Sequence, residues 1–153
     1  SLYALFPTIE AGMLLDIARH ELKPVDLFKL DSRFRDKFDV ERTEDSKART
    51  GTAKDYPSLH SLLIPLTTYF RVLQAFAASA GDTASTRLIG DGAGWYTAHL
   101  LELHQRYEWS AVVQYHMQFH LIRRREMADG DYSGWGHTDA DLMNQYLYDR
   151  HRS

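Results

Sequence analysis

Residues 58–81 read SLHSLLIPLTTYFRVLQAFAASAG, and this segment decides the fold. It is the longest apolar segment of the chain. Ser58 is a good residue for the N-cap of a helix, and Gly81 stands where a left-handed C-terminal cap is expected. Pro65 lacks an amide donor and clashes with the preceding turn, so we expect it to kink the helix or split it. The segment predicts a long helix that is bent or divided near Pro65.

Two helices are expected before this segment. Thr8 can cap a first helix that runs to about Leu22, and Pro24 suits the first turn of a short helix that ends at Leu30. The first helix has an apolar face, made of Ile9, Met13, Leu14, Ile17 and Ala18. A detached pair of helices cannot bury such a face, so we expect residues 2–30 to dock on the main bundle or on a second copy. The candidate self-association residues are Leu5, Phe6, Met13, Ile17, Leu27 and Phe28.

Two further helices are expected after Gly81. Residues 82–91 read as a connection with room for one helical turn, and it leads into the glycine-spaced turn GDGAG at residues 90–94. Hydrophobic spacing then predicts a helix from residue 93 to about residue 107. Ser110 is a good cap for the next helix, which is expected to end near Met127.

The last predicted helix follows a polar loop at residues 129–137. Thr138 and Asp141 resemble a capping box at its start. Its apolar residues are Leu142, Met143, Tyr146 and Leu147. Because no region shows the alternation of a strand, we predict an all-α bundle of five to seven helices.

A charged segment at residues 31–57 separates the two helical parts. About half of its residues are charged, and few are large and apolar. Such a segment cannot bury enough surface to offset the entropy lost on ordering, so we expect a partly mobile arm. The predicted organisation is an N-terminal helical segment at 1–30, the arm at 31–57 and the main helical domain at 58–153.

Composition excludes several classes of protein. The 153 residues, 44% of them hydrophobic and 25% charged, suit one globular domain. We expect neither a membrane protein nor a secretory precursor, because no apolar run approaches the roughly 18 residues that span a bilayer and the N-terminus lacks the basic-then-apolar pattern of a secretion signal. The absence of cysteine excludes disulfides, thiolate metal sites and cysteine nucleophiles, and it fits an intracellular location in the cytoplasm or nucleus. The net charge of −3 argues against binding nucleic acid through bulk positive charge.

Histidines are the first candidates for chemistry. His116 and His120 lie four residues apart, a spacing that lets two imidazoles on one helix share a metal. The other nearby donors are His99, Glu102 and His104. Zinc proteases of the HExxH type require glutamate directly after the first histidine, where this chain has methionine. We therefore expect partly buried or exposed rings, no metal and no cofactor.

Two anion-binding patterns are also incomplete. Gly90, Gly92 and Gly94 are spaced as in some phosphate loops, but no Lys-Ser or Lys-Thr pair follows them, so we interpret them as a turn before a helix. Three consecutive arginines form the only dense basic cluster and are the candidate nucleic-acid contacts: Arg123, Arg124 and Arg125. On a helix they fan over about 200°, so at most two can address one partner. Positive side chains near the C-terminus of a helix interact favourably with the helix dipole, and this is a sufficient structural reason for the cluster.

One constellation in the last quarter predicts an enzyme. His120 and Arg123, then Gly136-His137, then Tyr146 resemble the end of a tyrosine recombinase catalytic domain, and WGHTDADLMNQY is similar to that family's segment around its second histidine and nucleophile. The resemblance implies that His120, Arg123 and His137 hold a phosphate while Tyr146 attacks it and becomes linked to DNA. No convincing upstream arginine motif accompanies them. DNA breaking and joining is therefore the alternative function.

Aromatic spacing gives a second resemblance, over about residues 101–151. The frame consists of Trp109, Val113, Tyr115, Phe119, an arginine among residues 123–125, a polar loop, Trp135, Asp141, Leu142 and Tyr146. It resembles the region after the helical core in gag-like proteins of DIRS-type retrotransposons. The resemblance implies a non-enzymatic helical domain that self-associates or packages nucleoprotein, with any basic nucleic-acid-binding tail outside this chain.

The same aromatic residues, together with Trp95, are expected from their helical spacing to form core or helix–helix contacts. The predicted function is self-assembly of a gag-like module or a reused derivative of one. A helical adaptor for another protein is the second alternative.

Overall fold

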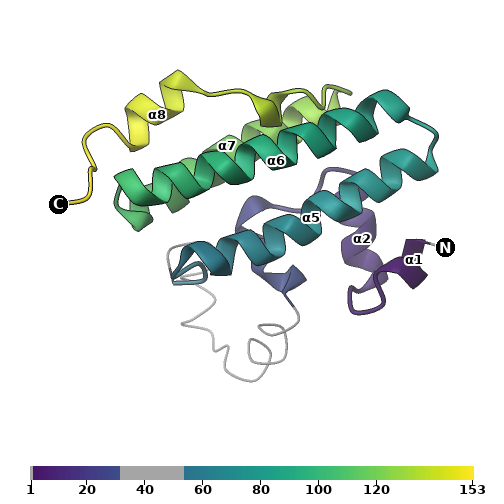
Figure 1. Ribbon diagram of the computed structural model, residues 1–153. Helices are drawn as coiled ribbons and strands as arrows, with labels where there is room; N and C mark the ends of the chain where they lie inside the picture. Colours follow the sequence, from purple (N-terminus) through teal and green to yellow (C-terminus); the bar gives the residue numbers. More distant parts are fainter. Residues whose placement is uncertain (1, 32–53) are drawn as a thin grey trace.

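The computed structural model describes residues 2–31 and 54–153, and the described residues form an all-α bundle (Figure 1). The predicted fold class is therefore confirmed, and no strand occurs in these two ranges apart from an isolated bridge between Tyr107 and His151. The helices are α1 (Leu2–Leu5), α2 (Ala11–Ala18), the 3-10 helix η1 (Pro24–Leu30), α5 (Leu59–Ser79), α6 (Thr83–Arg106), α7 (Trp109–Ala128), the 3-10 helix η2 (Gly134–Gly136) and α8 (Ala140–Tyr146).

Three long helices form the centre of the fold. The helices α5 and α6 run antiparallel along each other, and α7 lies behind α6 in the view of Figure 1. The segments α2 and η1 pack on α5, and η1 also contacts α7, while η2 packs on α6. The core is continuous across all of these elements.

The helix α5 begins and ends where the sequence predicts. The Ser61 amide donates to the Ser58 hydroxyl and the Ser58 amide donates to the Ser61 hydroxyl, which forms a reciprocal cap. Gly81 follows the helix in the left-handed conformation, with φ of 75°. Of the kink or split predicted at Pro65, the split does not occur, because α5 is one continuous helix. Proline removes one hydrogen bond near the start of the helix, and buried residues on both sides of Pro65 hold the turn against the core.

The helix α5 also has the length and apolarity to cross a bilayer, the only helix of the described residues that does. The expectation that no run approaches this length is therefore wrong. In the bundle α5 is the central helix, and nine of its residues are buried.

The region after Gly81 differs most from the prediction. The helix α6 begins at Thr83, where the Asp82 carboxylate accepts from the Ser85 amide at 3.0 Å. The predicted connection over residues 82–91 and the glycine turn are wrong, since all three glycines lie inside α6. This early N-cap lets the first half of α6 pack on α5, and burial of Ile89 outweighs the low helix propensity of glycine.

The last two α-helices have different caps from those predicted. The N-cap of α7 is Glu108 rather than Ser110. The helix α8 begins at Ala140, and the Asp139 carboxylate accepts from the Leu142 amide, so the predicted pairing of Thr138 with Asp141 is wrong. The intervening loop is partly helical, because η2 lies within it.

The N-terminal segment docks on the same chain's bundle. The predicted first helix corresponds to α2, which is shorter than expected and is preceded by α1. It ends before His20, whose φ is +60°. Its neighbour η1 confirms the short helix expected from Pro24. Residues on α2 and η1 are buried against the bundle: Leu14, Ile17, Leu27 and Phe28.

The predicted arm at residues 31–57 lies mostly at positions 32–53, outside the described residues. Near its end, Tyr56 is fully buried. Its hydroxyl donates to the Val25 carbonyl at 2.7 Å and accepts from the Phe28 amide at 3.1 Å. The Trp109 indole donates to the Tyr56 carbonyl at 2.6 Å. Tyr56 therefore joins η1 to the start of α7.

Candidate functional site

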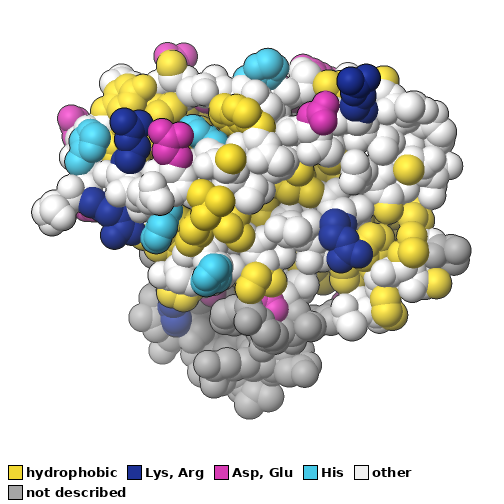
Figure 2. Space-filling model, in the orientation of Figure 1, with side chains coloured by type: hydrophobic (Ala, Val, Ile, Leu, Met, Phe, Trp, Pro, Cys, Tyr) yellow, Lys and Arg dark blue, Asp and Glu magenta, His cyan; other side chains and the backbone are white. Residues whose placement is uncertain are grey.

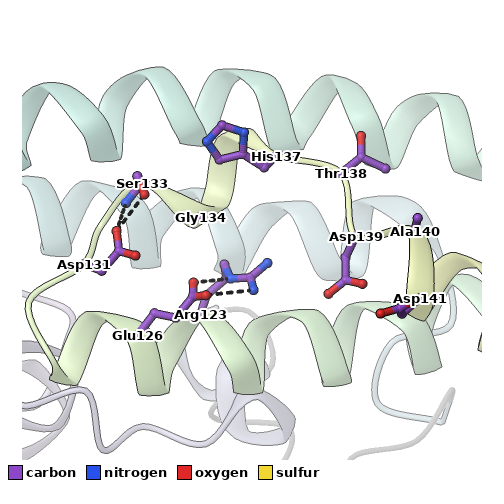
Figure 3. Close-up of a pocket in the computed structure, with 10 residues that line it drawn as sticks. All are labelled: Arg123, Glu126, Asp131, Ser133, Gly134, His137, Thr138, Asp139, Ala140 and Asp141. Atoms are coloured by element: carbon purple, nitrogen blue, oxygen red, sulfur yellow. Dashed lines mark hydrogen bonds and ion pairs between the residues drawn. The ribbon is translucent and has the colours of Figure 1, made fainter.

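The described residues form a pocket of about 330 Å³ between the end of α7, the η2 loop and the start of α8 (Figure 3). Arg123 is the only arginine or lysine that lines it, whereas the carboxylates are Glu126, Asp131, Asp139 and Asp141. The other lining residues are Ser133, Gly134, His137, Thr138 and Ala140. The excess of carboxylates disfavours a phosphate or other anion in this pocket.

Arg123 is held inside the pocket wall by Glu126. Its Nε donates to Oε1 at 2.7 Å and its Nη2 donates to Oε2 at 3.3 Å. The guanidinium also lies 4.4 Å from the centroid of the Phe119 ring, and only 9% of the side chain is exposed. Gly134 lies so close to this pair that an added Cβ would collide with Glu126 Oε1 and Arg123 Nε. The pair therefore fixes the loop against α7.

The neighbouring carboxylates also have structural partners. Asp131 Oδ1 accepts from the amide and hydroxyl of Ser133, at 2.9 and 2.6 Å, and these bonds lower the pKa of its carboxyl group. Asp139 caps α8. In residues 2–31 and 54–153, no group of three or more histidines, aspartates and glutamates is arranged to hold a metal. These contacts give Asp131 a role in the turn of the loop and Asp139 a role at the start of α8.

The four residues of the recombinase-like constellation are not assembled. Arg123 and His137 line the same pocket, but His120 is fully buried in the core. Tyr146 is at the far end of α8, six residues beyond Ala140 and about 9 Å along the helix axis, and it does not line the pocket. A nucleophile and a phosphate clamp have to converge on one phosphorus atom, and this arrangement does not bring them together.

His116 and His120 belong to the aromatic core. The Tyr96 hydroxyl and His116 Nδ1 are 2.7 Å apart, while the His120 ring lies 4.7 Å from that of Tyr69 and 5.1 Å from that of Trp135. Burial lowers the pKa of His116 to about 3 and that of His120 well below its ordinary value. Both rings are therefore neutral at physiological pH.

The other two candidate histidines lie elsewhere. His99 Nε2 is 2.9 Å from the Tyr115 hydroxyl, and burial lowers the pKa of His99. His104 lies near the C-terminal end of α6, edge-on to Trp109. Tyr96 lies beside both His99 and His116, whereas His104 contacts Trp109.

The three consecutive arginines point in different directions, as the helical fan predicts. Arg123 is buried beside Glu126, and Arg124 Nη1 donates to the Leu22 carbonyl at 3.3 Å. Of the three, only Arg125 is exposed. Two of the three candidate nucleic-acid contacts therefore have structural roles, one in the pocket wall and one between α7 and the N-terminal segment.

Glycines within α6 allow close packing instead of phosphate binding. An added Cβ at Gly92 would lie 2.7 Å from the Trp135 Cβ, and one at Gly90 would lie 2.7 Å from Gln74 Nε2. At Gly94 it would meet nothing within 4 Å. Two glycines thus let η2 and α5 approach α6, and the third leaves an open position on the surface.

The residues predicted for self-association are largely used within one chain. Phe6, Ile17, Leu27 and Phe28 are buried in the core, Met13 is half-buried and Leu5 is exposed. Their apolar face is covered by α5. The sequence correctly identified a face that requires burial, but it did not show that the same chain supplies the cover.

Most of the large aromatic residues are core residues, as expected. Trp135, Tyr96, Tyr115 and Phe119 are fully buried, and Trp109 and Tyr146 are half-buried. Trp95 remains 36% exposed on α6, stacked on His99 with ring centroids 4.8 Å apart. It is therefore the exception among the tryptophans.

We use the term α6 surface for the exposed residues around Trp95. Leu88 lies two turns before Trp95 on the same side of α6 and is 42% exposed, whereas Leu101, six residues after Trp95 and 45% exposed, lies about 120° around the helix. Two ion pairs flank them, Arg87 with Asp91 at 3.9 Å and Arg106 with Glu102 at 3.3 Å. Hydrophobic and charged side chains are mixed on the face of the molecule where α5 and α6 lie (Figure 2). The sequence analysis placed Trp95 and Leu101 on a predicted helix but missed Leu88, because it placed residues 82–91 outside a helix.

Comparison with known proteins gives no match to a protein family, to a curated protein or to a solved structure.

Proposed function

We propose that this chain is a non-enzymatic helical module that associates with copies of itself. The gag-like resemblance of residues 101–151 suggests such a role, and the α6 surface supplies the physical support. Leu88, Trp95 and Leu101 are large apolar residues left on the outside of a bundle whose other long helices bury most of theirs. Burying them between copies would remove their apolar area from water, the main favourable contribution to association.

The pocket in Figure 3 does not assemble the recombinase-like constellation. Its arginine is paired with Glu126, and Tyr146 is at the other end of α8. A recombinase-like role requires these groups to converge. The α6 surface requires no chemistry beyond apolar burial and charge pairing.

The experiment is a measurement of molar mass by light scattering across a concentration series. We expect dimers or larger species whose fraction rises with concentration. Leu88→Ser and Leu101→Ser should each weaken association, because each removes apolar area from the proposed interface. Leu15→Ser is the matched control, since Leu15 is 36% exposed, close to the 42% and 45% of Leu88 and Leu101, but lies on α2. A strict monomer at high concentration would overturn the proposal.

A further inference from the structure

His20 lies just beyond α2 in a backbone conformation that favours glycine. Its φ is +60°, and it is the one non-glycine residue with positive φ in the part of the chain that the structure describes. Many helices end with a glycine in this left-handed conformation, because a Cβ there crowds the following carbonyl oxygen. The amides of Glu21 and Leu22 donate to the Asp16 carbonyl across the turn, at 2.8 and 3.3 Å. Since the turn is an ordinary helix end, the side chain of His20 has to account for the histidine.

That side chain reaches the loop before η2. His20 Nε2 lies 2.7 Å from the Tyr132 hydroxyl, and the two rings meet edge-on with their centroids 5.4 Å apart. The two residues are 112 positions apart in the chain. This hydrogen bond therefore joins the N-terminal segment to the last quarter of the protein.

A second hydrogen bond holds the same turn from α7. Arg124 Nη1 donates to the Leu22 carbonyl at 3.3 Å, two residues after His20. The positive charge of Arg124 also acts on the His20 ring and on the Tyr69 hydroxyl of α5. The turn is thus held by a neutral contact with the loop and by a cation from α7.

The other ring nitrogen of His20 has no acceptor for a proton. Nδ1 is buried and has no hydrogen-bond partner among the described residues. A protonated imidazole carries a hydrogen on both nitrogens, so its Nδ1–H would be buried without an acceptor. The Nε2–H would at the same time prevent the Tyr132 hydroxyl from donating to the ring. The closed contact therefore requires a neutral histidine.

The surroundings of the ring act in the same direction. Burial and the charge of Arg124 lower the pKa of His20. Tyr132 from the loop and Tyr69 from α5 stay neutral, because burial raises the pKa of both hydroxyls. Asp82 at the N-cap of α6 acts on Tyr132. The charged residues next to His20 in its own segment are Arg19 and Glu21, which are exposed, and Asp16, which is half-buried.

We propose that His20, Tyr132 and Arg124 form an acid-sensitive clasp, which holds the N-terminal segment to the loop at residues 129–133 near neutral pH and opens on mild acidification. Protonated His20 repels Arg124, so the two hydrogen bonds of the clasp weaken together. The opening is local, because Leu14 and Ile17 remain buried against the bundle. The proposal is independent of how the chain associates.

The direction of the effect follows from proton binding. An exposed histidine in the open clasp titrates near 6.5, whereas the closed clasp lowers the pKa of His20. Between these two values the open state binds the additional proton. The closed clasp therefore loses stability as the pH falls through this range, by at most about tenfold in its equilibrium constant per pH unit.

The test is hydrogen–deuterium exchange of the full chain at pH 7.5 and 5.5, with each rate corrected for the intrinsic effect of pH. The amides of Glu21 and Leu22 report on one side of the clasp, and the amide of Asp131, which donates to the Glu126 carbonyl, reports on the other. Their protection should fall by about threefold or more at pH 5.5. Amides in the middle of α6 should exchange more slowly at both pH values, which identifies the opening as local.

His20→Asn removes the titrating group and keeps a residue that tolerates the left-handed conformation. Its clasp amides should be less protected at pH 7.5 and should lose no further protection at pH 5.5. Tyr132→Phe removes the same hydrogen bond without changing the turn and should also lower protection at pH 7.5. Arg124→Gln keeps a donor for the Leu22 carbonyl but removes the charge, so its loss of protection in acid should be smaller than that of the unmodified chain.

His137→Gln is the matched control, because it replaces an exposed imidazole in the same region and should lose protection in acid as the unmodified chain does. A loss that is retained in His137→Gln and absent from His20→Asn supports the clasp. The proposal is overturned if protection at these amides does not change with pH or if His20→Asn retains the loss. Exchange of these amides only together with the middle of α6 would overturn it as well, because the opening would then be global.

Discussion

The backbone of Gly92 lies directly against Trp135, and a Cβ at position 92 would be 2.7 Å from the Trp135 Cβ. Trp135 is fully buried, and its ring lies 4.7 Å from the ring of Phe70 and 5.2 Å from that of Tyr96. The indole therefore has no room to yield. This contact explains why a glycine occurs inside α6.

We expect Gly92→Ala to lower the free energy of unfolding by about 1–3 kcal/mol, the usual cost of forcing an extra carbon into a packed core. The loss should appear even though alanine favours helix by about 1 kcal/mol over glycine. Urea denaturation followed by circular dichroism measures it. Gly12→Ala is the control, because a Cβ at that helical position meets nothing within 4 Å, and it should be neutral or stabilising.

The Arg123–Glu126 pair gives a second prediction. Glu126→Ala leaves a guanidinium that is 9% exposed without its carboxylate, and we expect a loss of about 1–3 kcal/mol in the free energy of unfolding. Glu126→Gln should lose less, because the amide oxygen still accepts one hydrogen bond. Breaking the more exposed Lys29–Asp26 pair with Lys29→Gln should cost under about 0.5 kcal/mol. Equal losses in Glu126→Ala and Lys29→Gln would contradict this account of the pocket wall.

Acid should destabilise the bundle through its buried histidines. Burial lowers the folded-state pKa of His116 to about 3, whereas an unfolded histidine titrates near 6.5. Between these values the unfolded chain binds more protons, so stability falls as the pH decreases. The expected slope is about 1.4 kcal/mol per pH unit for each such histidine below pH 6, measured by urea denaturation at a series of pH values.

His120→Phe tests the source of this slope. His120 packs against the rings of Tyr69, His116 and Trp135. The positive charge of Arg124 also disfavours protonation of His120. The phenyl ring keeps the packing and cannot be protonated. The slope of the free energy of unfolding against pH should therefore fall by about 1.4 kcal/mol per pH unit in this variant. His137→Gln changes an exposed imidazole and serves as the control. An unchanged slope in His120→Phe would show that His120 is not the group being protonated.

Tyr56→Phe probes the link between η1 and the rest of the bundle. The hydroxyl donates to the Val25 carbonyl at 2.7 Å in a partly buried environment and accepts from the Phe28 amide at 3.1 Å in a buried one. Burial raises the pKa of this hydroxyl well above its ordinary value, which keeps it a donor. We expect a loss of about 1–2 kcal/mol in the free energy of unfolding, and faster amide exchange in η1. Tyr148→Phe, at an exposed position, should have almost no effect.

The sequence predicts the fold best where the signals are local. Ser58 and Gly81 mark the two ends of α5 because caps depend on neighbouring residues alone. The three glycines of α6 were wrongly assigned to a turn, because a tertiary contact and not local propensity accounts for Gly92. This glycine makes room for Trp135, which is more than 40 residues away in the chain. Local propensity favours a turn there, and packing overrides it.

The candidate site was less predictable for the same reason. The spacing of His120, Arg123 and His137 does not show that one of the three points into the core and the other two line a pocket. The apolar face of residues 2–30 was recognised, but periodicity carries no information on which surface covers it. The exposure of Leu88 on α6 becomes visible only once the helix is known to begin at Thr83.

The hydrogen bonds of Tyr56 have a consequence for how the chain can be divided. Residues up to 31 contact α5 and α7 directly. Residues from 54 onwards are held to the start of α7 by a separate hydrogen bond, from the Trp109 indole to the Tyr56 carbonyl. The peptide bonds between these two parts are therefore not what keeps them together. Two separately synthesised fragments, residues 1–31 and 54–153, should recognise each other in solution and rebuild the bundle as a noncovalent pair.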